Sequence, residues 1–249
     1  MLFEEIPPIP DYLYNINFIL GITQISLNLF IFLYIVIHLY AKDQFKEIKI
    51  EKRHRTNLAT WALFFLLIFI QNSLLLINQF FIAKQNISTE LDPTIERIAV
   101  LLIYSAFFVK ILYIERVIND LKFYKGYFFS IAFLGVMIII GLYLEAIKEI
   151  GPIQYFFIAL LIFSYSIIPM LYLYLSIKTV GESRKNALKV STGATMFGIG
   201  ALLGPLNLKG YYGISDELDV LINHTLIIGP FIAIIAVIII FDSFRKIKG

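Results

Sequence analysis

The sequence predicts an all-α integral membrane protein with seven transmembrane helices, built as a single domain over residues 1–249. The first observation is composition: 59% of the 249 residues are hydrophobic, 16% are charged and the mean hydropathy is +0.81. A soluble domain is about half apolar and about a quarter charged. The second is that seven apolar runs each approach the ~20 residues that cross a bilayer. The third is an alternation of basic charge between the segments that connect these runs.

Three predicted spans fill the first half of the chain. Span 17–40 follows an acidic, proline-containing start that lacks the basic region of a cleavable signal peptide, so we expect it to remain in the membrane. Span 58–83 lies between a strongly basic segment and Lys84. Span 98–117 begins after Arg97 and contains Lys110, the one clear charge well inside a span.

Four more spans follow with short connections. Spans 126–147 and 153–177 are nearly continuous apolar runs, whereas span 187–206 is weakest because serine, threonine and glycine interrupt it. Span 218–241 closes the series. Proline removes a backbone donor and bends a helix, so we name Pro169, Gly229 and Pro230 as hinge candidates. Small residues four apart permit close helix contact, which predicts packing at the pairs Gly200 with Gly204 and Ala194 with Gly198.

Basic residues orient the spans, because short cytoplasmic loops retain lysine and arginine. Segments 42–57, 116–125, 178–189 and 245–248 hold sixteen of them, against four in the alternate segments. This alternation requires all seven spans, including the sixth. It predicts a short extracellular tail at 1–16 and a short basic cytoplasmic tail at 242–249. We expect a multi-pass plasma-membrane protein with its N-terminus extracellular, and an isoleucine-, lysine- and asparagine-rich composition typical of a prokaryote.

Polar side chains within the spans gather in the half predicted to face outward. Such groups are costly in hydrocarbon and commonly mark functional sites, so we interpret them as an outward ligand pocket. The candidate ligand-binding residues are Asn72, Asn78, Gln79, Tyr104, Asn223 and His224. Two alternatives stay open. Amides also hold helices together by hydrogen bonds, and tyrosines also form interfacial belts.

Lys110 lies about 10 Å from the predicted inner boundary, counted at ~1.5 Å per residue. It can snorkel to the headgroups or join a local ion pair. It can also act as a functional counter-ion inside the membrane. The span 218–241 contains no lysine, which argues against a retinal protein despite the matching topology.

Recognisable catalytic chemistry is missing from the sequence. There is no cysteine, no HExxH zinc motif and no GxSxG nucleophile elbow. We therefore expect no enzyme activity, no catalytic residues, no metal and no cofactor. The basic inner loops predict contact with anionic lipid headgroups rather than with nucleic acid.

The segment Glu182-Ser183-Arg184-Lys185-Asn186-Ala187-Leu188, which leads into the glycine-rich sixth span, resembles the seven-helix sensor region in front of some prokaryotic histidine kinases. The resemblance implies a receptor or sensor for a small extracellular or lipidic ligand. Those sensors continue into an output domain, whereas this sequence ends soon after the seventh span. We therefore expect a separate cytoplasmic signalling protein as partner.

A small-solute transporter is the alternative function. The ends of the first and fifth spans, LYIVIHLYAK and LYLYLSIK, look alike and each precedes a basic segment. This resembles the three-plus-one-plus-three plan of the SWEET and PQ-loop carriers, whose halves are parallel repeats. The PQ dipeptide of those carriers is absent, and Pro169 has no counterpart in the first span.

Overall fold

The computed structural model describes residues 11–44, 52–78, 93–120, 126–149, 151–203 and 219–245, and these ranges are almost wholly helical, without a strand. The predicted all-α fold class is confirmed. The seven helices within these ranges are α1 (Asp11–Gln44), α2 (Lys52–Ile77), α3 (Pro93–Asp120), α4 (Phe128–Glu149), α5 (Gly151–Lys178), α6 (Gly181–Leu202) and α8 (Asp219–Arg245).

Several of these helices are suited to a membrane. Within the described ranges, four have enough length and apolar character to cross one: Asn15–Leu39, Arg55–Ile77, Arg97–Asp120 and Ile227–Phe244. Shorter apolar segments occur in α4 at Phe128–Ile139 and in α5 at Ile162–Lys178. The chain is therefore a helical protein of membrane type, and seven spans with a defined orientation stay a prediction.

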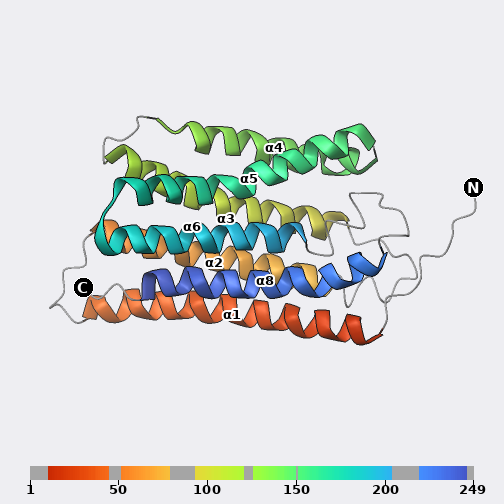
Figure 1. The fold of residues 1–249 in the computed structure, drawn as a ribbon, viewed down its shortest axis with the longest axis horizontal. Coiled ribbons are helices and arrows are strands. Elements are labelled where there is room, and N and C mark those ends of the chain that lie inside the picture. The colour runs from red at the N-terminus through yellow and green to blue at the C-terminus, as the bar shows by residue number, and fades with distance from the viewer. Residues whose placement is uncertain are drawn as a thin grey trace, which may run out of the picture.

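The helices form an up-and-down bundle (Figure 1). Helices α1, α3, α5 and α8 run in one direction, and α2, α4 and α6 run in the other. We call the end where α1 and α8 begin the N-terminal end of the bundle, and the end where they finish the C-terminal end. The sequence predicts that the N-terminal end faces outward.

Helix contacts arrange α1, α2 and α3 in one row and α5, α6 and α8 in a second row. Helix α4 lies at one edge of the bundle (Figure 1). In the first row α2 packs between α1 and α3, and in the second row α6 packs between α5 and α8. The rows meet where α3 contacts α5 and where α1 contacts α8. Helix α4 packs against α3 and α5.

An aromatic cluster around Trp61 fills the C-terminal half of the interior. Trp61 is 2% exposed, and its ring stacks on Phe65 of its own helix, on Tyr172 of α5 and on Phe244 of α8, at centroid distances of 5.8, 6.4 and 5.9 Å. Phe64 packs edge-on against Phe107 of α3. Stacked and edge-to-face rings add to the stability from burial alone, so this cluster joins both rows.

Glycines bring α6 into close contact with α8 and with α5. A Cβ at Gly200 would lie 2.7 Å from the Gly229 carbonyl oxygen, and one at Gly193 would lie 3.0 Å from the Ala236 carbonyl oxygen. These two glycines are seven apart and share one face. Gly198 instead faces Tyr165 of α5, where a Cβ would lie 3.0 Å from the tyrosine Cβ. Gly204, of the other predicted pair, lies outside the described residues.

The start of α4 is fixed to α3 by two side chains. Glu115 is fully buried, and its carboxylate accepts hydrogen bonds from the backbone N–H groups of Phe129 and Ser130, at 2.9 and 2.8 Å, and from the Ser130 hydroxyl. A carboxylate at a helix N-terminus satisfies free N–H groups and complements the helix dipole. Asn119 bonds both the N–H and the carbonyl of Gly126, whose φ of 138° favours glycine.

Pro169 and Pro230 both lie inside helices that continue past them. The α5 ribbon changes direction in its middle part (Figure 1), as expected of a helix that contains proline. The Ser191 hydroxyl of α6 donates a 2.9 Å hydrogen bond to the Pro169 carbonyl, which ties α6 to this part of α5. Gly229 lies against Gly200 in the α6–α8 contact, and whether any of the three acts as a hinge stays a prediction.

Candidate functional site

The buried face of α1 changes character along its length. Asn17, Asn28, Ile31 and Ile35 share this face, since their spacings of eleven, three and four residues are close to whole turns of 3.6 residues. Asn17 is 8% exposed and lies toward the N-terminal end of the bundle, Asn28 is 0% exposed and lies at the middle of the helix, and the two isoleucines lie toward the C-terminal end. The buried face of α1 therefore carries amides as far as its middle and hydrocarbon beyond it.

The buried face of α2 also changes from hydrocarbon to amide toward the N-terminal end of the bundle. Phe64, Gln71 and Asn78, spaced by seven, follow one stripe; all are buried, and Asn78 directly follows the last residue of the helix. A Cβ at Gly21 of α1 would touch the Leu76 side chain, which fixes the antiparallel register. In that register Asn17 lies near the height of Asn78, and Asn28 near that of Gln71, to within about two residues or ~3 Å.

We call these four residues, Asn17, Asn28, Gln71 and Asn78, the buried amide cluster; its two pairs lie at heights about 10–16 Å apart along the helices, counted at 1.5 Å per residue. Asn28 donates from Nδ2 to the Gln24 carbonyl at 2.8 Å, but its Oδ1 is buried without a hydrogen-bond partner among the described residues. The Nδ2 of Asn72, beside the cluster on α2, is likewise buried without one. Buried polar atoms nearly always have a partner, so these two atoms leave one acceptor on α1 and one donor on α2 that a further polar group could use.

The structure brings only part of the predicted pocket together. Asn78 and Asn72 lie on α2 in or beside the buried amide cluster, as described above. Tyr104 lies on another side of the first row, with its ring 5.5 Å from Phe133 of α4. Asn223 and His224 belong to the first turns of α8, at the N-terminal end of the bundle, but their side chains lie outside the described set, as does all of Gln79.

Asn17, Asn28 and Gln71 belong to the site without having been among the candidates. The signal was present as a spacing, since Asn17 and Asn28 share the face of Ile31 and Ile35. Polar groups within membrane helices usually face the bundle interior, so amides on this otherwise apolar face point to the buried side of α1.

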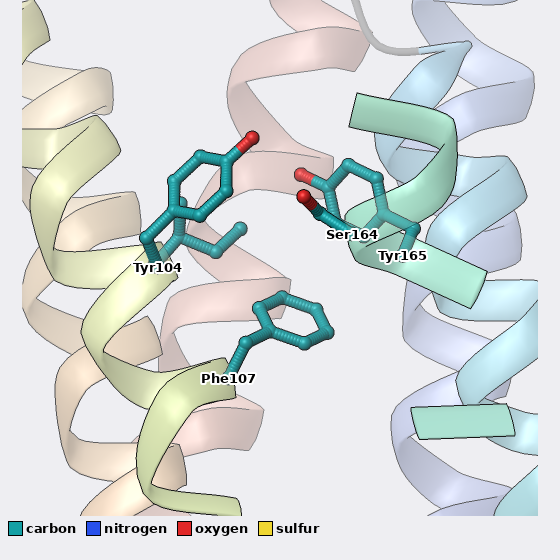
Figure 2. Close-up of a pocket in the computed structure, with 5 residues that line it drawn as sticks. Tyr104, Phe107, Ser164 and Tyr165 are labelled. Carbon is teal, nitrogen blue, oxygen red and sulfur yellow. The ribbon is translucent and has the colours of Figure 1, made fainter. Parts of the chain in front are cut away.

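Tyr104 lines a crevice between α3 and α5 with Ile103, Phe107, Ser164 and Tyr165 (Figure 2). The hydroxyl groups of Tyr104, Ser164 and Tyr165 all point into this space. The crevice is narrow, and the gap between its side chains does not admit a water molecule.

Lys110 is fully buried, so the snorkelling expected from the sequence is not the arrangement in the structure. Its Nζ donates to Asn57 Oδ1 at 2.9 Å and to Thr60 Oγ1 at 3.3 Å, and lies 3.7 Å from the centroid of the Trp61 ring. We call Asn57, Thr60 and Trp61 the lysine cage. The expected ion pair is also absent from the described residues, because Glu115 binds the start of α4 instead. Within the described residues, the Lys110 amino group therefore contacts neutral side chains.

Comparisons with known proteins leave the site to be interpreted from its own geometry. No protein-family model, no curated protein and no solved structure matches this chain. Within the described ranges, no group of three or more histidine, aspartate or glutamate side chains is placed to hold a metal ion.

Proposed function

We propose that this chain is a receptor-like membrane protein that binds a small neutral ligand, extracellular or lipidic, at the buried amide cluster and signals through a separate cytoplasmic protein. The observation that carries the proposal is the change of the interior of α1 and α2 from hydrocarbon to amide, with an unused acceptor on Asn28 and an unused donor on Asn72.

The chemistry of the cluster supports a neutral ligand. Amide side chains both donate and accept hydrogen bonds, and the cluster contains no charged residue that could balance an ionic ligand. Leaving a buried polar atom without a partner costs about 1–3 kcal/mol. A ligand that supplies both a donor and an acceptor would recover that free energy, whereas an apolar molecule would not.

Native mass spectrometry of the protein, released from its membrane in a mild detergent, tests the proposal. We expect a retained small molecule in the wild-type protein, its loss in Asn28→Leu and Asn78→Leu, and its retention in Ser164→Ala, a matched change of a buried polar residue away from the cluster. Thermal unfolding of each variant shows that the fold is intact. A wild-type spectrum with annular lipids alone would contradict the proposal and leave the amides as interhelical packing groups.

The second candidate function is small-solute transport, and one observation favours it. The two rows α1–α2–α3 and α5–α6–α8 pack in the same order, and their helices run in matching directions, with α4 between them in sequence and at the edge in space. This is the arrangement of a chain built from two parallel three-helix repeats. Uptake of a radiolabelled neutral solute into proteoliposomes, abolished by Asn28→Leu, would support transport over a receptor.

A further inference from the structure

Lys110 and its cage lie where both rows of the bundle meet. The ammonium contacts α2 through Asn57, Thr60 and Trp61, and the Trp61 ring continues to Tyr172 of α5 and Phe244 of α8. One charged side chain of α3 is therefore in contact with an aromatic stack that reaches both rows. Moving that ammonium would change the surroundings of the ring that joins them.

A second position of the Lys110 side chain, extended toward the C-terminal end of the bundle, competes with the caged one. A buried charge loses several kcal/mol of hydration, and in the described residues no carboxylate lies within ion-pair distance of Lys110 to offset that loss. Hydrogen bonds to neutral oxygens and the cation–π contact, worth about 2 kcal/mol when desolvated, compensate for it in part. Asn57 is only partly buried and Arg55 is exposed, so water at the C-terminal end lies within about one turn of the cage. A lysine side chain can extend to such a boundary.

We propose that Lys110 is a conformational switch between this caged state and a released state in which its ammonium points toward the C-terminal end of the bundle, and that α2 couples the switch to the buried amide cluster. The coupling follows from α2 itself. It carries the lysine cage near its start, and Gln71 and Asn78 follow about 15 and 25 Å further along the helix from Trp61, counted at 1.5 Å per residue. A helix that shifts or rotates moves both groups of side chains together.

The ligand of the proposed function would trigger the switch by binding at the buried amide cluster. Only this trigger rests on the proposed function. The two states of Lys110 and their coupling to Asn78 can be measured without any ligand. Native mass spectrometry without a retained ligand would therefore contradict the proposed function and leave the switch unaffected. A static Lys110 would contradict the switch even if a ligand were found.

The experiment uses Trp61, which is the one tryptophan in the chain. Replacing tryptophan by 5-fluorotryptophan places a single ¹⁹F nucleus in the cage, and its chemical shift responds to a charge 3.7 Å from the ring. In detergent micelles, we expect two exchanging resonances for wild type and a single resonance for Lys110→Met, which keeps the length of the side chain without its charge. Lys110→Arg, which keeps a cation able to stack on the ring, should restore two.

Two further variants test the direction of the switch and its coupling. Asn57→Leu removes an acceptor from the cage and should move the population at least two-fold toward the released resonance. Asn78→Leu should change the ratio of the two resonances at least two-fold in the wild-type background and leave the single resonance of Lys110→Met unmoved. Ser164→Ala, on α5, is the matched control and should leave the ratio as in wild type.

One wild-type resonance that Asn57→Leu does not move would overturn the switch and show a static lysine cage. Two resonances with a ratio insensitive to Asn78→Leu would overturn the coupling through α2. An effect of Asn78→Leu that persists in Lys110→Met would also overturn it, because the change would then reach Trp61 without the lysine.

Discussion

The contact between α6 and α8 allows a quantitative prediction for Gly200→Ala. The added methyl group would lie 2.7 Å from the Gly229 carbonyl oxygen, 2.9 Å from the Ala233 backbone nitrogen and 3.2 Å from the Ala233 Cβ. Two of these three atoms belong to the backbone of α8, so no side-chain rotation can make room. The helices must separate locally, and the packing next to Gly200 is lost with them.

Two opposing effects set the magnitude. Overpacking of a well-packed interior costs about 1–3 kcal/mol, and replacing glycine by alanine within a helix returns about 0.5–1 kcal/mol. We therefore expect Gly200→Ala to lower the free energy of unfolding by about 1–2 kcal/mol. Gly135→Ala on α4 is the matched control, because nothing lies within 4 Å of its added Cβ. It should be neutral or stabilising by up to about 1 kcal/mol.

Reversible unfolding by a denaturing detergent, followed by circular dichroism in mixed micelles, measures both variants against wild type. The difference between Gly200→Ala and Gly135→Ala is the quantity of interest, because helix propensity contributes equally to both. If Gly200→Ala were as stable as Gly135→Ala, the α6–α8 contact would have enough slack for a methyl group and the close backbone approach would be refuted.

Three further predictions concern other contacts and the topology. Glu115→Gln should lower the free energy of unfolding by about 1–2 kcal/mol, because the start of α4 loses a charge next to its free N–H groups. Thermal unfolding measures this change, and a variant as stable as wild type would show that the charge contributes nothing. Asp242→Asn should change the free energy of unfolding by less than about 1 kcal/mol, because the 2.6 Å ion pair between Lys189 and Asp242 is about one-third exposed. A loss above about 2 kcal/mol in the same assay would show that this ion pair stabilises the bundle strongly. In the naturally cysteine-free chain, cysteines at positions 50 and 185 should resist an impermeant thiol reagent added outside intact cells, and one at position 88 should react; labelling at 185 would reverse the predicted orientation of α6.

Helix identity and order could be predicted from sequence, because apolar runs of membrane length leave few alternatives. The helical ends were less predictable: α1 extends from Asp11 to Gln44, beyond the predicted span 17–40, and α3 reaches Asp120. Helices continue past an apolar segment where backbone hydrogen bonding still favours them, and hydropathy does not record this.

The polar character of the candidate site could be predicted from the sequence, but only some of the residues that form it could. Polar residues of the second span indicated Asn72 and Asn78, and the structure places both in or beside the buried amide cluster. Tyr104 shares their polarity but faces α4 and α5, because its position around α3 depends on neighbours that one helix's sequence does not encode. The neutral cage of Lys110 was equally hidden, since Asn57 and Thr60 lie 53 and 50 residues away in the chain.

The return passage of the chain through α4 has an electrostatic consequence for the whole bundle. Because α4 brings the chain back to the end where α3 began, α3 and α5 run parallel, as do α1 and α8 (Figure 1). Each helix carries a dipole along its axis, so neighbours within a row have opposed, mutually attracting dipoles, and neighbours across the two rows have aligned, mutually repelling ones. In a medium of low dielectric constant this repulsion is poorly screened. The helix dipoles therefore oppose association across the plane between the rows, and the aromatic cluster around Trp61 is among the contacts that hold the rows together there.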